Sequence, residues 1–283
     1  MTGESASPQP DVPTDRPTAA RIYDYGLGGK DNYAMDRELA KGTLEVFPEM
    51  LDVARQNRLY LYRAVRYLAA EAGISQFLDL GSGLPTDNNV HQVAQEFAPE
   101  SRVVYVDIDP IVLVHGHALL ADNPNTTVIT ADMTQPEHIL GHPDTQRLID
   151  FNQPVGVLMF SIPHCIPDDE GARRAIQGPM EHAASGSYLA ISHVVSEDPV
   201  AAAEMSAAVV EQGVPWKTRT PDVLDGWLRE LEPVEPGLGD IVNWRPDPTQ
   251  PPLPPAPGEL NRYVGASAGG KDMFEYGGVL RKP

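Results

Sequence analysis

The stretch that most constrains the fold of this chain is FLDLGSGLPTDN, residues 77–88. Apolar residues flank Asp79, a pattern typical of the end of a short buried strand. The glycines in 81–83 let the backbone turn sharply, because glycine has no Cβ. Thr86 or Asp87 is then placed to cap a helix with apolar residues at Val90, Val93, Ala94 and Phe97. Strand, glycine turn and helix N-terminus together predict a nucleotide-sized ligand site in an open α/β sheet.

Composition narrows the class of protein. The 283 residues suffice for one large α/β domain with additions or for two small domains, and 41% of them are apolar. The formal net charge of −19 argues against nucleic acid or an anionic membrane as the main partner. Cys165 is the only cysteine, which excludes an intrachain disulfide and a multi-cysteine zinc site. No metal-ligand spacing, signal peptide or membrane-length apolar run is visible, so we expect a cytoplasmic protein without a metal.

The N-terminal part divides into a predicted disordered tail, residues 1–17, and a helical extension, residues 18–73. The tail is rich in Ser, Pro, Thr and Asp. In the extension, three tyrosines surround a cluster of glycines before a helix that we expect near Asp36 (Tyr23, Tyr25 and Tyr33; Gly26, Gly28 and Gly29). Either this segment is a packed arm with aromatic anchors, or it is a lid that closes over a ligand. The sequence leaves both open.

Residues 49–70 carry the clearest helical periodicity in the chain and precede Gly73, which ends the helix. Four arginines lie among the apolar positions, and such arginines usually form a solvated face (Arg55, Arg58, Arg63 and Arg66). Asn57 and Arg58 would instead reach a ligand carboxylate if this helix packs near the glycine turn.

A second strand is expected in RVVYVDIDP, residues 102–110, with Asp107 and Asp109 at its carboxyl end. Asp107 lies 24 residues beyond Gly83, about the length of one crossover helix and the next strand. An acidic side chain at that place accepts hydrogen bonds from ribose hydroxyls in nucleotide-binding α/β folds. Asp109 equally suits a cap for a helix that begins at Pro110.

Two further strands end in polar residues. Residues 128–130 lead into Asp132 and Met133, where Asp132 is either a turn cap or an acceptor for an exocyclic adenine amine. The apolar run 155–160 is typical of a central parallel strand. Four polar residues emerge after it at the carboxyl edge, where open α/β sheets gather ligands (Ser161, His164, Cys165 and Asp168).

The remaining segments continue the alternation of strands and helices. We expect a strand at 187–195, helices at 199–211 and 221–231, an extended proline-rich loop at 245–258 and a last, edge-tolerant strand at 273–282. This order predicts a largely parallel sheet covered by helices on both faces.

The glycine turn also discriminates between nucleotides. The dinucleotide fingerprint G-x-G-x-x-G is broken, because Thr86 stands where the last glycine belongs, and no G-x-x-x-x-G-K-[ST] is present. Asp79 before the glycines would repel a pyrophosphate and suits a ligand with a cationic amine. The combination of D-x-G-x-G with acids after the second and third strands fits S-adenosylmethionine.

The order of these motifs resembles that of class I S-adenosylmethionine-dependent methyltransferases. RIYDYGLGGKDNY, FLDLGSGLPT, VDIDPIVLVHG and YGGVLRK look like one family of that class, described as S-adenosyl methyltransferases without a settled substrate. The resemblance covers residues 16–283 and implies a Rossmann-like, doubly wound, mostly parallel seven-stranded sheet over residues 74–283, preceded by the helical extension. Pro85, where a third glycine often sits, departs from the general class motif.

The resemblance also implies roles for individual residues. The turn 81–83 (Gly81, Ser82, Gly83) approaches the methionine moiety, with Asp79 near its amine. Asp107 binds the ribose, with Ile108 or Asp109 beside the adenine. Asp132 and Met133 match the adenine-contacting pair, and Phe160 and Ser161 lie beside the transferable methyl group.

Methyl transfer requires alignment of a nucleophile and exclusion of water, and some acceptors also need a base. His164 is the first candidate, because imidazole titrates near neutrality, although a structural histidine in that loop is the competing interpretation. His193 is the second candidate, and Tyr23 would line the substrate side of a lid. The leading hypothesis is methyl transfer to an O or N atom of a small molecule. The alternatives are a non-catalytic S-adenosylmethionine sensor or scaffold and an NAD-dependent oxidoreductase; monomer and homodimer both stay open.

Overall fold

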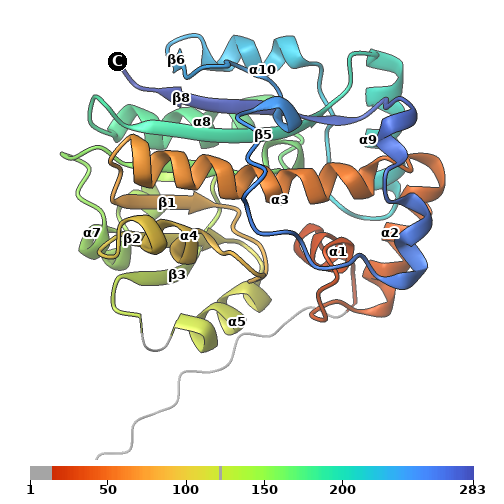
Figure 1. Ribbon diagram of the computed structural model, residues 1–283, viewed down its shortest axis with the longest axis horizontal. Helices are drawn as coiled ribbons and strands as arrows, with labels where there is room; N and C mark the ends of the chain where they lie inside the picture. The colour runs from red at the N-terminus through yellow and green to blue at the C-terminus, as the bar shows by residue number, and fades with distance from the viewer. Residues whose placement is uncertain (1–14, 121–122) are drawn as a thin grey trace, which may run out of the picture.

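The carboxyl ends of five parallel strands define one edge of the sheet in a computed structural model that describes residues 15–120 and 123–283 (Figure 1). Of the predicted disordered tail, residues 1–14 lie outside the described residues. The five strands are β1 (Gln76–Leu80), β2 (Arg102–Asp107), β3 (Thr126–Thr130), β4 (Gly156–Met159) and β5 (Tyr188–Val195). They lie in the order β3-β2-β1-β4-β5. The order reverses between β1 and β4, the point at which open α/β sheets bind ligands.

Beyond β5, the sheet contains one strand more than the seven that were predicted. The sheet has eight, because two-residue strands, β6 (Glu232–Pro233) and β7 (Gly239–Asp240), both pair with β8 (Phe274–Arg281). β8 runs antiparallel to β5 over its whole length, from Phe274 opposite Val195 to Arg281 opposite Tyr188. The last strand expected at 273–282 is therefore present as β8, but it lies inside the sheet, because it has neighbours on both sides.

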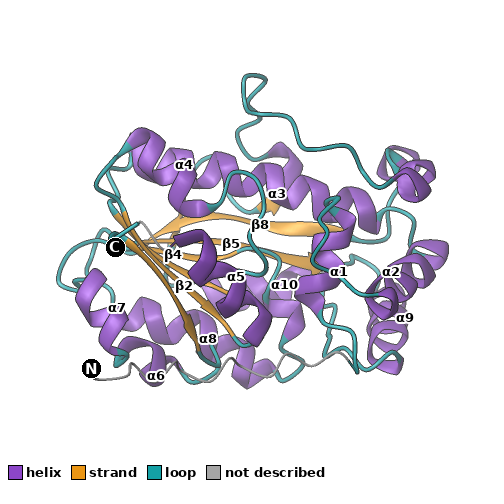
Figure 2. Ribbon diagram, turned by 90° about the horizontal axis from the view of Figure 1, so that it is seen from below, coloured by secondary structure: helices purple, strands orange, loops and turns teal. Residues whose placement is uncertain are grey.

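Helices cover both faces of the sheet, as Figure 2 shows in a view along its edge. One face carries α3 (Met50–Arg66), α4 (Val90–Phe97) and α5 (Pro110–Leu120). The other carries α6 (Pro136–Leu140), α7 (Pro143–Leu148), α8 (Asp169–His182) and α10 (Pro221–Leu228). Each parallel strand is thus buried on both sides, which explains the continuous apolar runs in their sequences.

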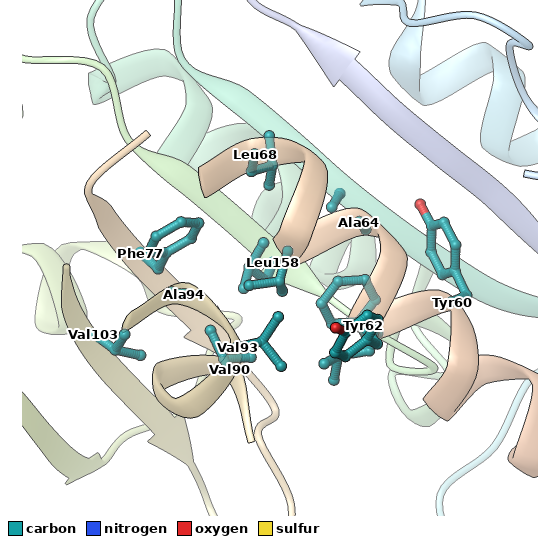
Figure 3. Packing of buried hydrophobic residues seen from close by; sticks show 14 of the residues in the cluster. Tyr60, Tyr62, Ala64, Leu68, Phe77, Val90, Val93, Ala94, Val103 and Leu158 are labelled. Carbon is teal, nitrogen blue, oxygen red and sulfur yellow. The ribbon is translucent and has the colours of Figure 1, made fainter. Parts of the chain in front are cut away.

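The long helix α3 organises its face of the core. It continues as one π-helical turn, Tyr67–Glu71, and ends before Gly73, whose φ of +72° suits glycine. Burial of one large side chain stabilises the fold by about 1.5–3 kcal/mol. Figure 3 shows α3 side chains packed against those of β1, β2, β4 and α4, among them Tyr60, Ala64, Leu68, Phe77, Val93, Ala94, Val103 and Leu158, all at most 1% exposed.

Two short helices precede α3: α1 (Ala19–Gly26) and α2 (Ala34–Val46). A buried ion pair joins them, with Arg21 Nε 3.0 Å from Asp36 Oδ2 and both side chains 0% exposed. Asp36 also accepts hydrogen bonds from the amides of Thr18 and Tyr33, at 3.1 and 2.8 Å. The helices α2 and α9 (Pro199–Glu211) both contribute to one satellite core. A boundary between lid and domain at residue 73 stays a prediction.

The proline-rich segment, residues 245–258, crosses α3 as an extended chain and leads into a short 3-10 helix, Gly258–Tyr263 (Figure 1). Arginines of α3 hold it: Arg55 donates to the carbonyl of Pro254 at 2.8 Å, and Arg66 pairs with Asp247 at 2.7 Å. Arg63 is 7% exposed and donates to the carbonyl of Trp244 at 2.9 Å. The arginines expected on a solvated face are thus largely committed to this segment.

Candidate functional site

The glycine turn lies directly after β1 and is fixed by β2. Gly81 and Gly83 have φ of +74° and +65°. The amide of Gly81 donates to the carbonyl of Val106 at 2.8 Å, and the amide of Gly83 donates to Oδ2 of Asp107 at 2.8 Å. A Cβ on Gly81 would lie 2.3 Å from Cδ1 of Ile162, so any other residue would have to displace that side chain as well as adopt a positive φ.

The helix after the turn begins later than the sequence predicted. Neither Thr86 nor Asp87 caps it; the N-cap of α4 is Asn89, whose amide donates to Oε1 of Gln92 at 2.8 Å. The intervening loop includes Asn88 in the left-handed region, with φ of +58°. Asparagine tolerates this conformation better than most residues, and the extra residues carry the loop towards α3.

Opposite charges face each other beside the turn. Asp79, at the end of β1, is 4% exposed, and burial raises the pKa of its carboxyl to about 7, while nearby Arg58 lowers it. Arg58 comes from α3 and donates to the carbonyls of Asp87 and Asn88 at 2.7 and 2.8 Å. The sequence condition for Arg58, that α3 packs near the glycine turn, is therefore met.

The end of β2 supplies a second acidic centre. Oδ1 of Asp107 accepts from the amide of Asp109 at 2.9 Å, and Oδ2 accepts from Gly83. Burial raises the pKa of Asp107. Asp109 caps α5 by accepting from the amide of Ile111 at 3.1 Å, the second of its two sequence interpretations. Ile108 is 63% exposed and leaves an apolar surface at this edge.

Asp132 forms a turn cap after β3. Its Oδ1 accepts from the amide and the hydroxyl of Thr134, at 2.9 and 2.8 Å, and these hydrogen bonds lower the pKa of its carboxyl despite partial burial. Met133 lies against the glycine turn, because its Cε is 3.1 Å from the place of a Cβ on Gly81. The end of β3 is thus brought to the same edge as the turn.

After β4 the chain turns back through Phe160 and Ser161. The Phe160 ring lies edge-on to Tyr60, with centroids 5.6 Å apart, and is 8% exposed. Ser161 adopts a φ of +59°, which is strained for serine, and its amide donates to Oγ of Ser192 at 2.8 Å. Such strain persists where surrounding contacts enforce it.

Tyr23 reaches this edge from α1. Its hydroxyl donates to the carbonyl of Ala54 at 3.0 Å and accepts from Nδ2 of Asn57 at 2.9 Å. Burial raises the pKa of Tyr23 to about 12, with the charges of Arg58 and Glu275 also acting on it. A phenol held in this way does not ionise near neutral pH.

The proposal of His164 as general base is not supported by its geometry. The ring is 2% exposed, and Nδ1 accepts from the amide of Val194 at 3.0 Å. Burial, with a contribution from Arg219, lowers its pKa to about 3. So weak a base takes a proton poorly near neutrality. His164 instead packs against Trp216, 4.1 Å between ring centroids, as the competing structural interpretation holds.

His193, the second candidate base, is fully buried beside His164, and neither ring nitrogen has a hydrogen-bond partner among the described residues.

We expect His193→Leu to stabilise the protein by about 1–3 kcal/mol, because two unpaired polar atoms leave the core. Burial holds the pKa of His193 well below 6.5. Below pH 6.5 the imidazole of His193 therefore gains a proton in the unfolded chain but not in the folded one. Wild-type stability is lost as the pH falls through this range. Urea unfolding at pH 5 and pH 8 should show the larger gain at pH 5; a loss of stability at both would contradict this.

The sequence did not single out Glu275, which lies in β8 and is 2% exposed. Its Oε1 accepts from the hydroxyl of Ser161. Burial raises the pKa of Glu275 to about 8, against the hydroxyls of Ser161 and Ser192, which lower it. Only the pairing of β8 with β5 brings this carboxyl to the carboxyl end of β4, so local sequence carries no signal for it.

The residues around the turn fit S-adenosylmethionine. An acid and an arginine match the amine and the carboxylate of its methionine part, and the acid after β2 matches its ribose. Oγ of Ser82 and Nε of Arg58 are buried polar atoms without a hydrogen-bond partner among residues 15–120 and 123–283. Such atoms are costly unless a ligand or water satisfies them. Over the same residues, no group of three or more His, Cys, Asp or Glu side chains is arranged to hold a metal ion, and no helix could span a membrane.

Comparisons with known proteins agree with this assignment. The family model described as S-adenosyl methyltransferase matches residues 5–283. A crystal structure from Thermobifida fusca YX, provisionally named a methyltransferase, shares 42% identity over 98% of this chain and 99% of its own, with a TM-score of 0.81. A DUF574 family protein from Streptomyces avermitilis MA-4680 shares 36% identity over 95% and 99%, with the same TM-score of 0.81.

None of the curated proteins matches the chain. The family model nevertheless covers nearly all of it, and both solved structures align along almost their whole length. The chain therefore belongs to the S-adenosyl methyltransferase family, and it is an enzyme whose cofactor is S-adenosylmethionine.

Proposed function

We propose that this enzyme transfers the methyl group of S-adenosylmethionine to an oxygen or nitrogen atom of a small molecule. The observation that carries the proposal is a pair of opposite charges beside the glycine turn, the buried Asp79 and the half-buried Arg58, which lowers the pKa of Asp79. Bound there, the cofactor supplies an electrophilic methyl group on a positively charged sulfur.

The chain's own groups would hold the cofactor as follows. Asp79 accepts from its amine and Arg58 donates to its carboxylate, while the glycines of the turn allow close approach. Asp107 accepts from the ribose hydroxyls, and Ile108 and Met133 offer apolar surface to the adenine. Phe160 and Ser161, which follow the end of β4, would lie beside the transferable methyl group.

A small acceptor is favoured over nucleic acid by the charge of the chain. A net charge of −19 repels a phosphate backbone, and binding to nucleic acid depends mainly on neutralising phosphates with Lys and Arg. The catalytic task of the protein is then alignment of the acceptor and exclusion of water.

Calorimetry tests the cofactor assignment directly. We expect S-adenosylmethionine to bind and NAD not to bind, because the turn lacks the last glycine of the dinucleotide motif. Tight NAD binding without S-adenosylmethionine binding would contradict the proposal.

Turnover tests the transfer. We expect release of S-adenosylhomocysteine when the enzyme and S-adenosylmethionine are incubated with a defined library of small amines, phenols and alcohols. Mass spectrometry would identify the member that gains 14 Da, the mass of one CH₂ unit. Modification of tRNA, rRNA or DNA in place of any library member would contradict the small-molecule assignment.

A further inference from the structure

Glu275 is a buried carboxyl that the binding of the cofactor leaves unused. Its Oε1 accepts from Ser161, but Oε2 is buried and has no hydrogen-bond partner among the described residues. An unpaired carboxylate oxygen inside a protein is costly, and native structures retain such groups mainly where a ligand or a reaction uses them.

The location of Glu275 places it at the acceptor side of the site. It stands opposite Val194 on β5, beyond the level at which β4 ends at Met159. Strand alternation puts its side chain on the face covered by α3, with Ser192 and Val194. The charges of both Glu275 and Arg58 act on the Tyr23 hydroxyl, and those of both Glu275 and Asp107 act on the Cys165 thiol. Its hydrogen bond with Ser161, just after β4, places Glu275 at the same edge of the sheet as the proposed cofactor site.

Ser161, the residue that donates its hydroxyl hydrogen to Glu275, also begins a chain of hydrogen bonds that runs from its amide through Ser192 and Asn57 to Tyr23. The Tyr23 hydroxyl donates to Ala54, so it accepts from Nδ2 of Asn57. Oδ1 of Asn57 then accepts the hydroxyl hydrogen of Ser192 at 2.6 Å, and Oγ of Ser192 accepts from the amide of Ser161.

The single hydroxyl hydrogen of Ser192 is thus committed to Asn57, and the one of Ser161 goes to Oε1 of Glu275. A serine hydroxyl has only one hydrogen to donate. The Ser192 hydroxyl still acts on Glu275 and lowers its pKa, but Oε2 has no hydrogen-bond partner among the described residues, so that oxygen is left for another partner.

We propose that Oε2 of Glu275 binds the N–H or O–H of the methyl acceptor and takes its proton during methyl transfer, which makes Glu275 the general base of this enzyme. This inference rests on the proposed function. The acceptor's lone pair forms the bond to the methyl carbon, and the carbon–sulfur bond breaks with its electron pair left on sulfur. The acceptor's proton moves to ionised Glu275, so the acceptor exchanges one proton for one methyl group and the sulfonium becomes a neutral thioether.

The surroundings of Glu275 suit a carboxyl that changes its protonation. The groups that face it are Ser161 and Ser192, Tyr23 from α1, Tyr60 from α3, Cys165 after β4 and Asp240 from β7. Asp240 pairs with Lys271. Because no cation faces Glu275 directly among these groups, burial dominates and favours its neutral form before a positive charge arrives.

The test compares S-adenosylmethionine with S-adenosylhomocysteine, which lacks the positive charge on sulfur. Calorimetry at pH 7.5 in buffers of different ionisation enthalpy measures the protons released on binding. We expect S-adenosylmethionine to release more protons than S-adenosylhomocysteine, because the sulfonium favours ionised Glu275. Any proton released by Asp79 is common to both ligands and cancels. Equal release by the two ligands would overturn the proposal.

Glu275→Gln separates this role from a structural one. The glutamine carbonyl still accepts the hydroxyl of Ser161, so a residue that only held Ser161 in place would leave every readout unchanged. We expect the variant to abolish the difference in proton release and to bind S-adenosylmethionine within about threefold of wild type. For any library member that wild type methylates, we expect turnover to fall by about 10²–10⁴-fold, the usual contribution of a general base.

Glu232→Gln is the matched control, since Glu232 lies exposed on β6 and pairs with Arg281 at 3.3 Å. It should behave as wild type in both measurements. A difference in proton release that survives in Glu275→Gln would overturn the role of Glu275 while leaving the proposed function intact. Failure of both ligands to bind wild type would overturn the proposed function and this inference with it.

Discussion

Asp107→Ala is expected to raise the dissociation constant for S-adenosylmethionine by about 100-fold. Hydrogen bonds to a charged group contribute about 1.5–3 kcal/mol each, and the proposed ribose contact is of that kind. The same carboxylate also accepts from the amides of Gly83 and Asp109, at 2.8 and 2.9 Å, so its removal loosens the glycine turn. Calorimetric titration measures the effect.

Asp107→Asn is the control for the turn. Its amide oxygen can still accept from one of the two amides, so the fold of the turn is partly kept while the charge is lost. We expect its affinity to lie between those of wild type and Asp107→Ala. An unchanged dissociation constant in the alanine variant, with native circular dichroism, would refute the ribose role of Asp107.

Arg21→Met is expected to lower the free energy of unfolding by about 3–5 kcal/mol, because it leaves Asp36 buried without its cation. Both side chains are 0% exposed, and among the described residues the amides of Thr18 and Tyr33 would be left to compensate the carboxylate. Urea unfolding measures the loss, which should also lower the melting temperature by on the order of 10 °C.

Arg147→Met supplies the comparison on the surface. Arg147 pairs with Asp144 at 3.1 Å, with side chains 52% and 42% exposed. Exposed pairs contribute about 0–1 kcal/mol, so this variant should unfold near wild type. If both variants lost the same free energy of unfolding, the buried ion pair between Arg21 and Asp36 would not be what stabilises the contact of α1 with α2.

The sequence predicted the parallel strands well because their apolar runs are direct consequences of burial on two faces. The segment 155–160 became β4, and the acids at 79, 107 and 132 all lie at one edge, since parallel strands share their carboxyl ends. The predicted cap of α4 was wrong. The loop through Asn88 makes Asn89 the N-cap, so the helix begins at Val90.

The failures at the site share one cause, which is pairing between distant segments. His164 looked available because its loop follows a central strand, but the Val194 amide and the Trp216 ring enclose it. The sequence did not single out Glu275, because only the pairing of β8 with β5, β6 and β7 shows that its strand is interior. Two-residue strands are too short to show periodicity in a sequence, so β6 and β7 could not be predicted.

The position of β8 has a consequence for synthesis of the chain on the ribosome. Every other strand of the sheet precedes β8, yet β8 alone covers the open side of β5 along its whole length. A nascent chain that has emerged only as far as residue 273 therefore exposes an unpaired edge of β5, the kind of edge that recruits strands from other chains. When residues 274–281 pair with β5, they cover that edge and at the same time bring Glu275 to Ser161. Protection of the β5 edge and formation of the contact between Glu275 and Ser161 are thus coupled in time.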